Sequence, residues 1–190
     1  MADPDTAARI ATSMYLLGRK AFVTGRVLDV GCGRMPYKRM FASCEWVGLD
    51  KRPVGDIEAD MHKTELDDES FDTIVCTDVL HLTPSPVSAI TEMARVLKPG
   101  GHIVVVTRTT PPTGEDVYLG IHPAALGRML ISAGLAGVDL MPEGRLISQE
   151  WAEVTGFDKY HFSMPPTIGD WCEQMDRRYP AITGAVAKKE

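Results

Sequence analysis

Residues 26–35, which read Arg-Val-Leu-Asp-Val-Gly-Cys-Gly-Arg-Met, constrain the fold of this chain more than any other stretch. Val27, Leu28 and Val30 form a short apolar run of the kind that makes a buried parallel strand. The two glycines that follow permit a sharp turn and let a ligand approach the bare backbone, and Pro36 has a φ suited to the first turn of a helix. A strand, a glycine turn and a helix start in this order predict a nucleotide-binding βα unit.

A second predicted strand, residues 46–50 (Trp-Val-Gly-Leu-Asp), ends in the carboxylate of Asp50. A carboxylate at this place can accept hydrogen bonds from both ribose hydroxyls of an adenosine. A dinucleotide fingerprint would have a third glycine where Pro36 stands, and the sequence contains no phosphate-loop Gly-Lys-Ser/Thr. Lys51 and Arg52 could form the 2′-phosphate site of an NADP enzyme, but without that glycine we interpret them as solvated residues that flank an adenosine pocket.

Four blocks of the sequence together resemble one family. They are residues 27–33 (Val-Leu-Asp-Val-Gly-Cys-Gly), 47–50 (Val-Gly-Leu-Asp), 70–76 (Ser-Phe-Asp-Thr-Ile-Val-Cys) and 95–101 (Arg-Val-Leu-Lys-Pro-Gly-Gly). Their order and spacing resemble the class I S-adenosylmethionine-dependent methyltransferases, most closely the small-molecule, type 11-like branch with the Leu-Lys-Pro-Gly-Gly signature. The resemblance covers residues 26–107. It implies S-adenosylmethionine as cofactor, S-adenosylhomocysteine as product and a small-molecule acceptor as partner.

The resemblance also implies the fold class. We expect an α/β protein with a three-layer, Rossmann-like, doubly wound sheet of seven strands, mostly parallel with the last strand antiparallel. We expect a single domain over residues 1–190, with a leading helix in residues 1–24. Residues 26–107 would then form the cofactor-binding half and residues 108–190 the acceptor-side half.

A set of cofactor-binding residues is implied by the same resemblance. These residues are Asp29, Gly31, Cys32, Gly33, Asp50, Lys51, Asp60, Met61, Thr77 and Asp78. The Asp60 carboxylate and the Met61 backbone are expected to meet the adenine edge, although a loop aspartate can instead cap a turn. Asp29 either satisfies the glycine-loop backbone or orients the amino group of the cofactor through water, and both roles can hold because a buried charge needs several partners.

Met35 departs from the family pattern, in which a glycine usually completes Gly-x-Gly-x-Gly. We expect this methionine to adopt the right-handed region. Its flexible side chain would either line the cofactor pocket or pack under a short helix at residues 37–41.

Two histidines are candidates for a catalytic base. His81 follows the predicted strand 71–76 at a position where the family commonly has glutamate, and His122 follows the loop after the next strand. An ordinary histidine pKa of about 6.5 suits the removal of a hydroxyl proton at neutral pH. The structural alternatives are that His81 packs beside a helix start and that His122 caps a helix opened by Pro123.

Apolar periodicity predicts the remaining elements. A first helix at residues 5–20 and a later helix that starts at Pro86 each carry a stripe of apolar side chains. The stripes are Ile10, Met14, Leu17 and Ala21 in the first and Val87, Ile90, Ala94 and Leu97 in the second, which Ser85 caps. Further strands are expected at residues 102–107, 138–141 and 159–164, and a closing helix at 167–179. The loop of residues 109–120, rich in Pro, Gly and Thr, is expected to hang over the site.

Composition and charge narrow the function classes. A net charge of −6 argues against a nucleic-acid partner, because phosphate binding favours a basic face. No apolar run reaches the ~18 residues of a membrane span, and no secretory signal is visible. The four cysteines have no Cys-x-x-Cys spacing, so we expect no metal site and a cytoplasmic location. The remaining alternatives are a non-catalytic S-adenosylmethionine-binding regulatory protein and an NAD(P)-dependent oxidoreductase.

Overall fold

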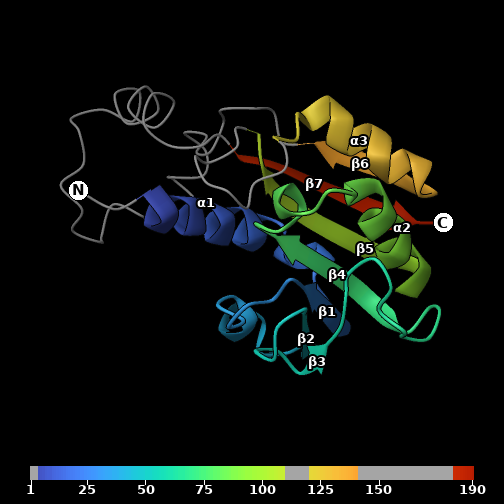
Figure 1. The fold of residues 1–190 in the computed structure, drawn as a ribbon, viewed down its shortest axis with the longest axis horizontal. Helices are drawn as coiled ribbons and strands as arrows, with labels where there is room; N and C mark the ends of the chain where they lie inside the picture. Colours follow the sequence, from blue (N-terminus) through green and yellow to red (C-terminus); the bar gives the residue numbers. More distant parts are fainter. Residues whose placement is uncertain (1–3, 110–119, 141–181) are drawn as a thin grey trace.

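A twisted seven-stranded sheet forms the centre of the computed structural model, which describes residues 4–109, 120–140 and 182–190 (Figure 1). The strand order is β3-β2-β1-β4-β5-β7-β6. The strands are β1 (Arg26–Val30), β2 (Glu45–Asp50), β3 (Ile57–Glu58), β4 (Phe71–Thr77), β5 (Leu97–Arg108), β6 (Leu135–Leu140) and β7 (Ile182–Lys189). Figure 1 shows β2 and β3 at one margin of this sheet and β6 and β7 at the other.

The direction of the strands confirms the expected fold class. All pairs among β1, β2, β3, β4 and β5 are parallel, whereas β7 is antiparallel to both β5 and β6. The last described strand is therefore the one that runs against the others. The chain moves outward from β1 to β3 and then crosses back to β4, so the strand order reverses between β1 and β4. Open α/β sheets bind ligands at such a reversal, beyond the carboxyl ends of the strands.

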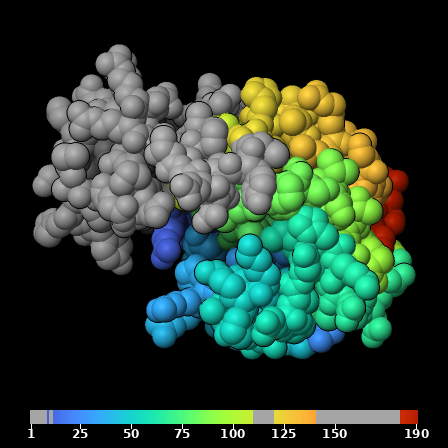
Figure 2. Space-filling view, in the orientation of Figure 1, coloured from blue at the N-terminus to red at the C-terminus, as the bar shows by residue number. Residues whose placement is uncertain are grey.

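Helices cover both faces of the sheet among the described residues. They are α1 (Pro4–Gly18), α2 (Pro86–Val96) and α3 (Pro123–Ser132), with short 3₁₀ helices η1 (Lys20–Phe22), η2 (Lys38–Phe41) and η3 (Leu80–Leu82). One core cluster joins α2 and α3 to the sheet, and a second joins α1 and η2 to the opposite face. In the space-filling view α2 and α3 form a continuous surface, beyond which only one end of β7 is visible (Figure 2).

The residues of β5 reflect its position in the middle layer of this three-layer arrangement. Ile103 and Val105 belong to the core under α2 and α3, while Val104 and Val106 belong to the core under α1. All four side chains are fully buried. A strand buried on both faces needs an unbroken apolar run rather than an alternating one, which is what residues 103–106 provide.

The inner face of the first helix differs from the prediction. Met14 is buried as expected and Tyr15 lies in the core as well, but Leu17 is 46% exposed, Ala21 is also exposed, and Leu16 is buried in place of Leu17. The reason lies in β7, because a Cβ on Gly184 would fall 2.6 Å from the Tyr15 ring. The ring therefore lies directly on the bare backbone of β7 and sets the rotation of the helix.

The second helix also differs in its first turn. Ser85 occupies the N-cap position of α2 but its side chain makes no capping hydrogen bond, and Val87 is 46% exposed. The buried face is formed by Pro86, Ala89, Ile90, Met93, Ala94 and Val96. The predicted stripe was right at Ile90 and Ala94 and wrong at Val87, because the face that packs on the sheet begins one residue earlier, at Pro86.

The strand predicted at residues 138–141 overlaps β6, but no strand was predicted at the residues that form the antiparallel last strand. That strand is β7, whereas the expected strand 159–164 and closing helix 167–179 lie outside the described residues. Residues 184–187 of β7 read Gly-Ala-Val-Ala, and glycine and alanine have low β-propensity. The burial of β7 comes from its place between β5 and β6, which local sequence does not reveal.

Candidate functional site

The glycine loop, residues 31–33, follows the carboxyl end of β1 and is hydrogen-bonded to the end of β2. The N–H groups of Gly31 and Cys32 both donate to the carbonyl oxygen of Leu49, at 2.8 and 3.1 Å. Gly31 has a φ of +71°, and a Cβ there would lie 2.6 Å from the side chain of Val79, which follows β4. A glycine is therefore required at 31, because the chain beyond β4 comes close to the loop at the reversal of strand order.

Asp50 lies at the end of β2, facing this loop. The residue is 5% exposed, and its carboxylate Oδ2 accepts the Gly33 N–H at 3.0 Å. Arg52 supplies the other donors, since its N–H and Nε lie 3.0 and 3.1 Å from Oδ1 and its Nη2 lies 3.3 Å from Oδ2. Burial raises the pKa of Asp50, but the hydrogen bonds from Arg52 and Gly33 outweigh burial and leave that pKa below its ordinary value. Sequence reasoning placed Asp50 and missed its pairing with Arg52, which it treated as merely solvated.

Met35 adopts a left-handed backbone conformation, with a φ of +52°. The expectation of the right-handed region was therefore wrong, and the residue occupies the conformation that the usual glycine would favour. A Cβ on Gly48 would lie 2.7 Å from the Met35 sulfur and 2.8 Å from the Cys32 sulfur. The side chain thus covers the bare backbone of β2 and packs against the core cluster that contains Phe41, as the structural alternative predicted.

Asp29 is buried in the middle of β1, with 1% of its surface exposed. Its Oδ2 accepts a hydrogen bond from the Trp46 indole at 3.1 Å. Burial raises the pKa of Asp29 to about 7, against the lowering effect of the Trp46 hydrogen bond and with a further increase from the charge of Asp50. The N–H groups of residues 31–33 donate to Leu49 and Asp50 rather than to Asp29, so the prediction that Asp29 satisfies the glycine-loop backbone is wrong.

Asp60 caps a turn after β3. Its Oδ1 accepts the His62 N–H at 2.9 Å and lies 2.5 Å from His62 Nδ1, and these hydrogen bonds lower the pKa of Asp60. The other ring nitrogen of His62 lies 2.6 Å from the Thr83 hydroxyl, just before α2. The turn-capping alternative is therefore observed, while the contact of Asp60 with adenine stays a prediction. Met61 is half-buried against the core, and Lys51 is exposed.

The carboxyl end of β4 meets the first helix. Thr77 is 8% exposed, and Asp78 follows with a φ of +53° and its N–H donating to the Val106 carbonyl at 2.9 Å. The Thr12 hydroxyl of α1 donates to Asp78 Oδ2 at 3.2 Å, and Arg108 Nε of β5 lies 3.6 Å from Asp78 Oδ1. The Asp78 carboxylate therefore links α1 to the ends of β4 and β5, at the edge of the sheet where Asp50 and the glycine loop also lie.

The two candidate bases have different environments. His81 lies in η3 with 2% of its surface exposed, and its Nδ1 is 3.4 Å from the Thr107 hydroxyl. Burial, together with the charge of Arg108, lowers the pKa of His81 to about 4, so this imidazole is neutral at pH 7.

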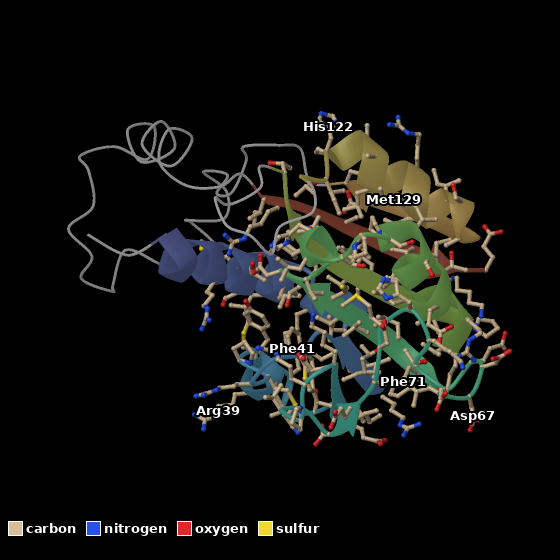
Figure 3. All side chains as sticks on the ribbon, in the orientation of Figure 1. Arg39, Phe41, Asp67, Phe71, His122 and Met129 are labelled. Atoms are coloured by element: carbon tan, nitrogen blue, oxygen red, sulfur yellow. The ribbon has the colours of Figure 1, made fainter. Side chains whose placement is uncertain are left out.

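His122 is exposed at the start of α3, on the outer side of the molecule (Figure 3). Its Nδ1 accepts the Ala124 N–H at 3.2 Å, so it caps the helix as the structural alternative predicted.

Within residues 4–109, 120–140 and 182–190, no group of three or more His, Cys, Asp or Glu side chains could hold a metal ion. No helix in the same ranges is long and apolar enough to cross a membrane. Residues 110–119 of the predicted loop over the site lie outside the described residues.

Residues 28–105 match the family model described as a methyltransferase domain. Over these residues the chain is similar to methyltransferase domains. This match confirms the family resemblance drawn from the four sequence blocks, and the matched residues run from β1 into β5. They include the glycine loop, Asp50 and the end of β4.

Named relatives and a solved structure agree with this similarity. The chain is 26% identical over 170 residues to a ubiquinone biosynthesis O-methyltransferase of Alkalilimnicola ehrlichii, covering 80% of this chain and 60% of that protein. It is 30% identical over 112 residues to a demethylmenaquinone methyltransferase of Clavibacter sepedonicus, covering 53% and 45%. The chain thus spans about half to three-fifths of the length of these two relatives. A structure of an S-adenosylmethionine-dependent methyltransferase from Archaeoglobus fulgidus has the same fold, with a TM-score of 0.66, 18% identity and coverage of 95% and 94%.

Proposed function

We propose that the protein binds S-adenosylmethionine beyond the carboxyl ends of β1, β2 and β4 and transfers its methyl group to a small-molecule acceptor by in-line displacement. S-adenosylhomocysteine is the product. The observation that carries this proposal is the buried, ionised Asp50 facing the glycine loop where the strand order reverses, in a chain that is similar to methyltransferase domains over residues 28–105.

The glycine loop fits an adenosyl group. A Cβ on Gly33 would meet no described atom within 4 Å, so the second glycine of the loop borders open space rather than a packed side chain. Asp50 lies beside this glycine with an oxygen 3.0 Å from its N–H. A ribose that hydrogen-bonds to the carboxylate can therefore lie against bare backbone.

The other residues of the site would position the two ends of the cofactor. Asp60 and the Met61 backbone would meet the adenine edge beyond β3. Thr77 and Asp78 would close the crevice at the end of β4, where Asp78 is already linked to α1.

Methyl transfer requires mainly that the acceptor is correctly oriented toward the methyl group of the cofactor. When bound, the sulfonium cofactor supplies an electrophilic methyl group, so the chain itself has to hold the acceptor in line with it. In intramolecular reactions, orientation of this kind is worth about 7–11 kcal/mol. A base is needed only for an acceptor proton of high pKa, such as that of a hydroxyl. His81 is the base we propose for that case, because its imidazole is neutral at pH 7 and follows the end of β4. Its lowered pKa makes it a weaker base than the ordinary histidine that the sequence led us to expect.

A small molecule is the acceptor class that the comparisons support. The names of the two relatives refer to ubiquinone biosynthesis and to demethylmenaquinone. The net charge of −6 gives the surface no general attraction for nucleic-acid phosphates.

Thermal unfolding with S-adenosylhomocysteine, NADH and NADPH tests the binding half of the proposal. A ligand at 100 times its dissociation constant adds about 2.7 kcal/mol of stability, so we expect a clear shift with S-adenosylhomocysteine alone. A shift with a nicotinamide cofactor instead would favour the oxidoreductase alternative.

Radiolabelled S-adenosylmethionine, incubated with the protein and fractionated small molecules of a cell extract, tests the transfer half. We expect label in an organic product, with formation of S-adenosylhomocysteine. Binding without any transfer would favour the regulatory alternative.

A further inference from the structure

The carboxylate of Asp50 has its hydrogen-bonding capacity filled by the chain itself. Two carboxylate oxygens offer about four acceptor positions. Four donors fill these positions: the N–H groups of Gly33 and Arg52, and the Nε and Nη2 groups of the Arg52 guanidinium. Two ribose hydroxyls cannot be added to such a carboxylate unless existing donors leave.

Only the guanidinium can leave without moving the backbone. The Gly33 N–H belongs to the loop that is hydrogen-bonded to Leu49, and the Arg52 N–H belongs to the turn after β2. The Arg52 side chain is 64% exposed, whereas the Asp50 side chain is 6% exposed. The guanidinium is therefore the solvent-exposed partner of this pair, and the carboxylate is the buried one.

We propose that the Arg52 guanidinium is a displaceable cover on Asp50, and that two ribose hydroxyls replace its two hydrogen bonds when the nucleoside binds. This inference rests on the proposed function, because it needs ribose to bind at Asp50. The cover keeps the carboxylate paired in the free protein and lowers the affinity for every ligand that must displace it. The guanidinium side of the pair is exposed, so solvent screens the interaction and its strength is modest. Displacement is therefore easy, and the reduction in affinity is small.

Adenosine is the appropriate probe, because it contains the ribose but carries no charge. Its affinity therefore does not change merely because a positive charge is removed from the protein. We would measure its dissociation constant by calorimetry for the wild type, Arg52→Ala, Arg52→Gln and Arg39→Ala. Arg39 is the matched control, an exposed arginine of η2 that Figure 3 shows on the outer side of the molecule.

We expect Arg52→Ala to bind adenosine about two- to fivefold more tightly than the wild type, the range that corresponds to an exposed ion pair. Arg52→Gln should also bind more tightly, and Arg39→Ala should match the wild type. In the wild type, the Nε–H signal of Arg52 in nitrogen-15 NMR spectra should exchange faster with water when adenosine is added, because it has lost its acceptor.

Equal or weaker binding by both Arg52 variants, while the wild type binds, would overturn the cover and leave the proposed function intact. If adenosine binds only once Arg52 is replaced, the cover is supported in its strongest form. If neither adenosine nor S-adenosylhomocysteine binds to the wild type or to any variant, the proposed function fails, and the cover fails with it.

Discussion

Replacement of Asp29 by asparagine tests whether a carboxylate buried in β1 destabilises the fold. The residue is 1% exposed, and its pKa is raised from 3.8 to about 7, chiefly by burial. An asparagine at this position would keep the shape and could still accept the Trp46 indole hydrogen bond, but it could not ionise. The variant therefore isolates the cost of the charge from the packing of the side chain.

The sign and size of the change in unfolding free energy with pH follow from the protons that Asp29 binds in the folded and unfolded states. Between pH 3.8 and about 7, folded Asp29 holds a proton that the unfolded chain has lost, so the free energy of unfolding falls as pH rises through this range and is constant above it. Each pKa unit is worth about 1.4 kcal/mol, which gives a total of about 4 kcal/mol. About 2–3 kcal/mol of this total develops between pH 5 and pH 8.

The titration of His81 changes the stability with pH in the opposite direction, so its contribution must be separated from that of Asp29. Its folded pKa of about 4 lies below the ordinary 6.5, so the unfolded chain binds the extra proton between these values and stability rises with pH there. Between pH 5 and pH 8 this contributes about 2 kcal/mol, which would mask most of the Asp29 effect in the wild type alone. The difference between Asp29→Asn and wild type removes the His81 contribution, because both proteins contain that histidine.

Urea denaturation at pH 5 and pH 8 is the assay. We expect the free energy of unfolding of Asp29→Asn, taken relative to that of the wild type, to be about 2–3 kcal/mol higher at pH 8 than at pH 5. Asp67→Asn is the control, because it makes the same change on an exposed loop side chain (Figure 3), and we expect its difference to stay within about 0.5 kcal/mol at both pH values. A difference between Asp29→Asn and wild type that is the same at pH 5 and pH 8 would refute the reasoning.

Three further predictions concern the cofactor, the packing of α1 and the base. Asp50→Ala should weaken S-adenosylhomocysteine binding by about 2–3 kcal/mol, because charge-assisted hydrogen bonds to two hydroxyls are lost; unchanged affinity in calorimetry would contradict the ribose assignment. Gly184→Ala should destabilise the fold by about 1–3 kcal/mol in urea, since the new Cβ would fall 2.6 Å from the Tyr15 ring, and Tyr15→Leu in the same chain should recover part of the loss. His81→Ala should lower turnover of a hydroxyl acceptor by on the order of 10², the lower end for general-base catalysis because the pKa of His81 is lowered, with little change in donor affinity. In wild type the contribution of His81 should stay constant above about pH 5, because its pKa is about 4; undiminished turnover in the variant would exclude this base.

The cofactor half of the fold was predictable because its signals are local. Asp50 was assigned from a short apolar run that ends in a carboxylate, and the structure places it against the glycine loop. The conformation of Met35 could not be read in this way, because a methionine in a sequence does not indicate a positive φ. The pairing of Arg52 with Asp50 also escaped prediction, since the direction of an exposed arginine depends on the turn that carries it.

The elements on the other side of the sheet depend on contacts between distant residues. Tyr15 is buried because Gly184 leaves room for its ring, and these two residues are far apart in the sequence. Helical periodicity alone favoured Leu17, which is exposed. A strand rich in glycine and alanine gives little local evidence of itself, so neither β7 nor its contact with Tyr15 could be inferred before the fold was known.

The place of β7 in the sheet has a consequence for how the protein folds. β6 reaches β5 only through β7, which lies between them and follows both in the sequence. The five parallel strands and the α3–β6 unit can each form early, but neither can complete the sheet until residues 182–189 have joined it. Pairing between segments so distant in sequence is slow, because loop-closure entropy is lost before the contacts form. Until β7 pairs with it, that edge of β5 has unpaired backbone groups, and such an edge favours aggregation.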